Sequence, residues 1–113
     1  MPDHKPAFKS YAEFWPYYLS EHSRHATRMM HVVGAVLALF ALAKAVLYMS
    51  FGWLVVALIF GYGFAWTAHA FVEKNRPATF SHPLWSLRGD FHMLGLWLTG
   101  KLEIELTRHN ILT

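Results

Sequence analysis

The 113-residue sequence contains no cysteine and few charged residues. The absence of cysteine excludes disulfide bonds, thiolate metal sites and a cysteine nucleophile. Only 15% of the residues are charged and 55% are hydrophobic, a composition too apolar for a typical soluble domain of this size. The basic residues form no clustered stripe, so nucleic acid binding is not expected. Any metal ion must be bound by histidine, carboxylate, backbone or water, in a protein that we expect to be integral to a membrane.

Two long apolar segments predict a pair of transmembrane helices within a single domain covering residues 1–113. The first helix is expected over about 28–49 and the second over about 51–73, joined by a short connection that makes them antiparallel. Small residues recur at helical spacing in both segments, as Gly34, Ala38, Ala41 and Ala45 and as Ala57, Gly61 and Ala65. Such stripes let membrane helices approach closely, so they predict the interface of a tight hairpin.

Two further helices are predicted, one on each side of this hairpin in the sequence. A capping box at Ser10 and Glu13 starts an aromatic helix over about 10–20, whose composition is typical of a membrane interface. Pro83 opens an apolar helix over about 83–99 that we expect to pack against the hairpin. The predicted fold is an all-α integral membrane bundle with an N-terminal interfacial helix, an antiparallel transmembrane hairpin and a third apolar helix.

The distribution of positive charge predicts the orientation in the membrane. Nine of the ten lysines and arginines lie before Met29 or after Phe71. The positive-inside rule therefore places both termini on the cytoplasmic side. We expect the hairpin ends next to these termini, and any site that they carry, to lie at the same cytoplasmic surface.

Histidine is unusually frequent, with eight residues in so short a chain. His69 and Glu73 are four residues apart, so on a helix both side chains leave the same face. In an antiparallel hairpin His31, near the start of the first long helix, lies at the same membrane surface as His69. The sequence therefore predicts that these three residues lie close together.

His22 joins this group only if the chain is not helical between the first two helices. Nine residues separate His22 from His31, which places them about 180° apart on one unbroken helix. A break between Ser23 and Thr27, with one of these two residues as the N-cap, would fold His22 back toward His31. A shared site therefore requires a non-helical junction here.

Three imidazoles and one carboxylate form a ligand set that suits a divalent metal ion: His22, His31, His69 and Glu73. Non-haem iron is often bound by histidine and carboxylate, and zinc accepts the same ligands. A haem held between His31 and His69 is one alternative. Another is a non-enzymatic lipid-binding or scaffold protein whose histidines only satisfy buried polar groups.

Several motifs resemble a family of small membrane proteins that includes the 2-hydroxy fatty acid dioxygenase of the eukaryotic endoplasmic reticulum. The matching segments are Tyr17-Tyr18, Glu21-His22, His31-Val32-Val33-Gly34, Ala65 to His69, Glu73 to Phe80 and Pro83 to Phe91. The resemblance implies an iron(II) dioxygenase that removes one carbon from a 2-hydroxy fatty acid by alpha-oxidation, as in phytosphingosine breakdown. It also implies that His22, His31 and His69 are essential.

With that activity, the expected partners are a fatty acid substrate, O2 and the membrane. Glu73 is then either a fourth iron ligand or a partner that orients an imidazole. The candidate substrate-binding residues are Lys74, Asn75, Arg76, Arg88 and Asp90. Of these, Lys74, Arg76 or Arg88 would pair with the substrate carboxylate.

Overall fold

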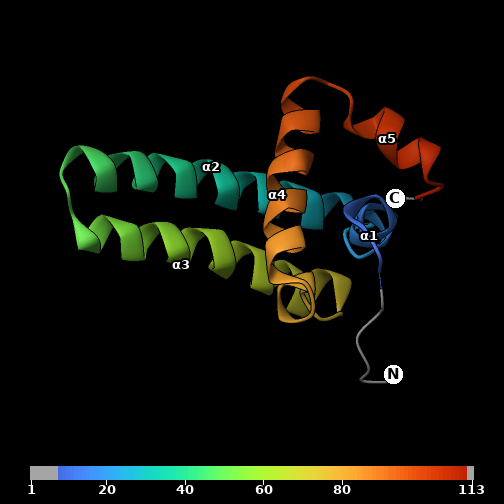
Figure 1. Cartoon of the computed structure of the whole chain (residues 1–113), viewed down its shortest axis with the longest axis horizontal. Coiled ribbons are helices and arrows are strands. Elements are labelled where there is room, and N and C mark those ends of the chain that lie inside the picture. The colour runs from blue at the N-terminus through green and yellow to red at the C-terminus, as the bar shows by residue number, and fades with distance from the viewer. Residues whose placement is uncertain (1–7, 112–113) are drawn as a thin grey trace.

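The computed structural model describes residues 8–111, and all regular secondary structure in that range is helical. Five α-helices, one π-helix and one 3-10 helix follow one another along the chain (Figure 1). They are α1 (Tyr11–Ser20), α2 (His25–Leu47), α3 (Phe51–Thr67), the π-helix η1 (Ala68–Glu73), the 3-10 helix η2 (Ala78–Phe80), α4 (Pro83–Leu98) and α5 (Leu102–Arg108). α2 and α3 form a long hairpin, and α1, α4 and α5 gather toward the end opposite its turn.

The hairpin is built on close contact between its two helices. α2 and the continuous run of α3 and η1 are each 23 residues long and apolar enough to cross a membrane. A Cβ placed on Gly34 would come within 2.7 Å of the Cβ of Phe64, and one placed on Gly61 would lie 3.7 Å from Ala38. The small-residue stripes therefore do form the helix interface. Large apolar side chains such as Phe40, which is 61% exposed, cover the outside of the hairpin.

Ser10 is the N-cap of α1, and its Oγ accepts a hydrogen bond from the backbone N–H of Glu13 at 3.3 Å. The Glu13 carboxylate does not complete the predicted capping box, because it accepts from the backbone N–H of Lys9 instead. The aromatic residues of α1 were expected at a membrane interface, but several are buried under α4 and α5. The core contains Phe14, Trp15, Tyr18, Leu19, Ala78, Met93, Leu102 and Leu106.

α4 runs across the hairpin rather than along it (Figure 1). On its buried side Gly89 lies against Tyr18 of α1, where an added Cβ would come within 2.8 Å of the ring. On its outer side Leu84, Leu87 and Phe91 are exposed. These three residues recur at helical spacing and form one apolar face. The third apolar helix is therefore present, packed on one side and uncovered on the other.

Gly89→Ala is expected to lower the free energy of unfolding by about 1–3 kcal/mol, because the added methyl group overpacks the contact with Tyr18. Gly95→Ala is the matched control in the same helix, since no atom lies within 4 Å of its added Cβ. There, alanine should stabilise the helix by up to about 1 kcal/mol. Thermal unfolding in detergent measures both variants, and shifts of the same sign and size would contradict this packing.

Candidate metal centre

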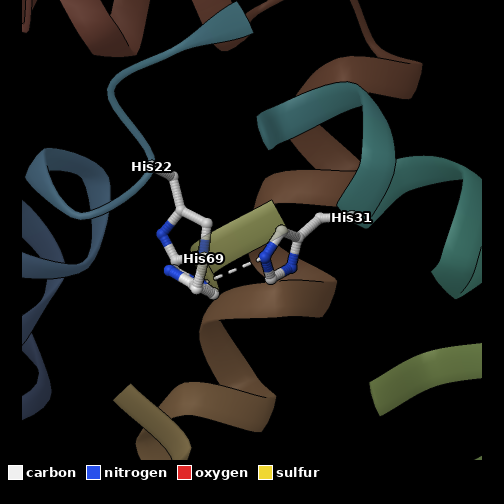
Figure 2. A group of neighbouring side chains, drawn as sticks. All are labelled: His22, His31 and His69. Atoms are coloured by element: carbon white, nitrogen blue, oxygen red, sulfur yellow. Dashed lines mark hydrogen bonds between the residues drawn. The ribbon is translucent and has the colours of Figure 1, made fainter. Parts of the chain in front are cut away.

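Three histidines from separate segments meet near the open end of the hairpin. His22 follows α1, His31 lies in α2 and His69 lies in η1, and their rings point toward one another (Figure 2). The Nε2 atom of His69 lies 3.1 Å from Nε2 of His22 and 3.3 Å from Nε2 of His31. All three residues are buried. Within residues 8–111 they are the one cluster of this kind that could hold a metal ion, and we call it the histidine triad.

His22 reaches the triad because residues 21–24 are not helical. Arg28 fastens this junction by donating from Nη1 to the backbone carbonyls of His22 and Ser23, both at 2.9 Å. An unbroken helix would hold His22 and His31 on opposite faces. A break is therefore present as predicted, but it covers residues 21–24, and residues 25–27 already belong to α2. The role of the Arg28 guanidinium, which is 1% exposed, was not predicted.

The protonation of His22 follows from its hydrogen bond. Its Nδ1 lies 2.6 Å from the backbone carbonyl of Tyr18. Because a carbonyl only accepts, Nδ1 carries the proton and Nε2 presents a lone pair to the triad. Burial, together with the nearby His31 and His69, lowers the pKa of His22 well below its ordinary value. His22 is therefore neutral, as a metal-binding imidazole must be.

Asn75 fixes the tautomer of His69. The Nδ2 atom of Asn75 donates to the backbone carbonyl and to the carboxylate of Glu21, each at 3.1 Å. This leaves Oδ1 of Asn75 to accept from Nδ1 of His69 at 2.6 Å. Nε2 of His69 therefore also presents a lone pair to the triad. The side chain of Asn75, which the sequence predicts to bind substrate, forms hydrogen bonds with His69 and Glu21 in the structure.

Asp90 of α4 lies beside Nδ1 of His31. Nδ1 of His31 lies 3.5 Å from Oδ1 of Asp90, and the Tyr18 hydroxyl donates to the same oxygen at 2.5 Å. Burial and the adjacent Asp90 carboxylate raise the pKa of Tyr18 well above its ordinary value, so the phenol keeps its proton. Nε2 of His31, on the other side of the ring, faces the triad.

The Nε2 atoms of His22, His31 and His69 converge on one point, where the lone pairs of His22 and His69 could bind a cation. Nitrogen ligands about 2.0–2.1 Å from a metal ion lie about 3.0 Å apart in octahedral geometry and about 3.4 Å apart in tetrahedral geometry. The measured Nε2 separations of 3.1 and 3.3 Å fall within this range. The residues therefore fit a divalent ion that binds neutral imidazole, such as iron(II) or zinc.

A haem between His31 and His69 does not fit. A haem held between His31 and His69 would need room for its macrocycle between the two imidazoles. Here the two Nε2 atoms are 3.3 Å apart, and the imidazole planes are inclined by 84°. His22 closes a third side of the same space, 3.1 Å from His69. The triad is therefore not built as a bis-histidine haem site.

The carboxylate of Glu73 caps the N-terminus of α2. It accepts hydrogen bonds from the backbone N–H of Arg24 at 2.6 Å, from the Thr27 hydroxyl at 2.7 Å and from the Ser23 hydroxyl at 3.0 Å. The N-cap residue is Arg24, without a side-chain capping bond, so neither Ser23 nor Thr27 is the cap that the sequence predicts. A carboxylate from the neighbouring helix supplies the acceptor and the negative charge instead.

The π-helical turn explains why the side chains of Glu73 and His69 point in different directions. Residues in η1 are joined by i→i+5 hydrogen bonds, so side chains four apart no longer stack directly as they do in an α-helix. Lys74 ends the turn in the left-handed conformation, with φ of 60°. The backbone N–H of Asn75 then donates to the carbonyl of His69 at 3.0 Å. This turn directs His69 into the triad and Glu73 toward α2.

The basic residues expected to bind the substrate lie at the protein surface. Lys74, Arg76 and Arg88 are all exposed. The guanidinium of Arg88 lies over the ring of Tyr11, 4.0 Å from its centroid. Asp90, by contrast, lies beside the triad and lines a cavity together with His31.

Asn75→Ala is expected to weaken metal binding by about 10–100-fold, because His69 loses the acceptor that fixes its tautomer and ring orientation. Competition with a chromophoric chelator measures the affinity for zinc or iron(II). Lys74→Ala is the matched control, since it removes the exposed neighbouring side chain and should leave the affinity unchanged. An Asn75→Ala protein with wild-type affinity would show that this hydrogen bond does not support the site.

Fold and triad together define the class: an all-helical protein with two helices able to cross a membrane and three buried histidines able to hold a metal ion. A family model described as 2-hydroxy-palmitic acid dioxygenase Mpo1-like matches residues 8–102, so the chain belongs to the Mpo1-like family. The resemblance seen in the sequence motifs is thereby confirmed. Searches of curated proteins and of solved structures found no match.

Proposed function

We propose that the protein is an iron(II)-dependent dioxygenase that shortens 2-hydroxy fatty acids by one carbon. The observation that carries the proposal is the convergence of the Nε2 atoms of three buried histidines, with a polar group beside each Nδ1: the Tyr18 carbonyl, Asn75 and Asp90. The description of the family supports this activity and a 2-hydroxy fatty acid as the substrate.

His22, His31 and His69 would hold the iron and leave room for substrate and O2. When bound, iron(II) supplies the redox chemistry by which O2 oxidises the substrate. The reaction balances with O2 as the only oxidant: a 2-hydroxy acid and one O2 give the acid one carbon shorter, carbon dioxide and water. The protein's own groups orient the imidazoles and shield them from solvent.

The surrounding residues then divide into two roles. We propose that Asn75, Asp90 and Glu73 position the triad, the first two by orienting imidazoles and Glu73 by tying α2 to η1. For the substrate carboxylate we propose charge-assisted hydrogen bonds from one or more of the exposed basic residues. These are Lys74, Arg76 and Arg88.

We further propose that α2 and the run of α3 and η1 cross the membrane, with the triad and both termini on the cytoplasmic side. Of the lysines and arginines within residues 8–111, only Lys44 lies at the other end of the hairpin. Its ammonium group lies over three aromatic rings at 5.3–5.6 Å, those of Phe40, Tyr48 and Trp53. Aromatic rings around a snorkelling lysine are typical of a membrane interface.

Turnover of defined substrates tests the activity. Protein loaded anaerobically with iron(II) and then exposed to O2 is expected to convert 2-hydroxypalmitic acid to pentadecanoic acid, detected by mass spectrometry. Palmitic acid, which lacks the 2-hydroxyl group, is the control and should remain unchanged. Iron-loaded protein that binds 2-hydroxypalmitic acid without forming pentadecanoic acid would contradict the proposal and favour the lipid-binding alternative.

A further inference from the structure

A cavity of about 230 Å³ lies between α2, α3 and α4 and adjoins the histidine triad. His31 and Asp90 line one end of it. Farther along the hairpin its lining includes Ala38 and Gly61, the small residues at which the two long helices touch. Small side chains on both helices leave an indentation between the larger residues on either side. The stripe that allows the helices to pack therefore also forms a groove leading away from the triad.

The groove is apolar beyond the triad and ends among leucines. Its lining extends to Leu42 of α2 and Leu54 of α3, close to the hairpin turn. Leu42 follows His31 by eleven positions, which correspond to a helix rise of about 16 Å. Apart from His31 and Asp90 at the near end, Tyr62 is the one polar residue in the lining. The groove thus has two ionisable residues at one end and is almost entirely apolar along the rest of its length.

The groove is open along its side. Leu54 is 38% exposed and Leu58 is 53% exposed, although both line the cavity. Within a bilayer these side chains face lipid tails, which are as apolar as the groove itself. A molecule with one long hydrocarbon chain can therefore enter laterally from the membrane, without passing through water.

We propose that this groove binds the acyl chain of the 2-hydroxy fatty acid and that its far end, at Leu42 and Leu54, sets the preferred chain length. The inference rests on the proposed function, which places the carboxyl and 2-hydroxyl groups at the triad. The reacting carbon then lies beside His31 and Asp90, and the methyl end of the acyl chain points toward the hairpin turn. Ala38 and Gly61 lie midway and admit the chain because they are small.

A substitution that fills the middle of the groove tests this placement. Ala38→Phe is expected to lower kcat/KM for 2-hydroxypalmitic acid by at least about tenfold relative to 2-hydroxyoctanoic acid, because the long chain loses its path. Ala43→Phe is the matched control, since Ala43 lies on the exposed part of the same helix and outside the groove. It should keep the wild-type ratio. Equal losses for both acids, or no loss, would contradict the proposal.

Photo-crosslinking of the wild-type protein provides a readout that needs neither turnover nor a correctly folded variant. A 2-hydroxypalmitic acid with a diazirine at its methyl end, bound in detergent without iron, should label residues near Leu42 and Leu54. Labelling confined to the outer surface, for example at Val46 or Phe40, would overturn the groove even if the enzyme is active. If the groove is labelled but the iron-loaded protein shows no turnover, the proposed reaction is refuted and the proposed binding site is supported.

Discussion

His69→Ala is expected to reduce the iron content from about one ion per chain to background and to abolish turnover of 2-hydroxypalmitic acid. His69 is the histidine with Nε2 within 3.3 Å of both other triad nitrogens, so its loss leaves the proposed site with only two imidazoles. Removing a residue that merely orients a ligand weakens metal binding by about 10–100-fold, so removing a ligand should weaken it by more than about 100-fold. Elemental analysis after reconstitution and desalting measures the bound iron.

His25→Ala is the matched control for this variant. His25 is exposed at the first residue of α2, close in sequence to the triad but outside it. It should bind as much iron as the wild-type protein. Circular dichroism establishes that His69→Ala keeps its helices, and His69→Gln provides a second variant with a polar side chain in the same position. Wild-type iron content in either His69 variant would contradict the assignment of the site.

Glu73→Ala is expected to lower the free energy of unfolding by about 2–4 kcal/mol, the range for losing a helix cap together with hydrogen bonds to a charged acceptor. The substitution leaves the backbone N–H of Arg24 and the hydroxyls of Ser23 and Thr27 without their acceptor. It also removes the negative charge that stabilises the N-terminus of α2. Thermal unfolding in detergent measures the loss.

Glu73→Gln distinguishes a cap from a metal ligand. Its amide oxygen still accepts a hydrogen bond from the start of α2, so the variant should regain much of the lost stability and retain iron. If Glu73 were a ligand, replacing the carboxylate by an amide should remove iron almost as completely as His69→Ala does. That outcome would contradict the capping role that the structure gives to Glu73.

The hairpin and the meeting of the histidines could be predicted because they follow from local patterns. Apolar length indicates two spans, small residues indicate their contact, and a short connection makes them antiparallel. Antiparallel helices bring His31 and His69 to the same end, and the distance between them, 3.3 Å, is consistent with that reasoning. The non-helical junction before α2 was predicted from the requirement that His22 reach the same site.

The groups that orient the triad could not be predicted, since they depend on contacts between residues far apart in the sequence. Tyr18 and Asp90 are 72 residues apart, and the amide of Asn75 meets Glu21 across 54 residues. No periodicity specifies such pairs. Periodicity did not predict the hydrogen bonds of Glu73 with α2 either, because a π-helical turn replaces the α-helical geometry that the four-residue spacing assumes.

The position of α4 could also not be predicted from the sequence. Its apolar residues on several faces indicated burial, but gave no direction for the helix axis. In the structure, Gly89 allows α4 to lie against the Tyr18 ring. α4 crosses the hairpin (Figure 1). This crossing has a functional consequence, because it brings Asp90 to His31 and places Phe91 in the lining of the groove.

X-ray absorption spectroscopy at the iron edge tests the central claim most directly, namely that His22, His31 and His69 bind one metal ion. For the iron-loaded protein, the fine structure should show three imidazole groups around the iron, with nitrogen distances of about 2.0–2.2 Å. The number should fall to two or fewer in any iron retained by His69→Ala. An iron coordinated by one imidazole or none, or a spectrum unaffected by the substitution, would contradict the claim.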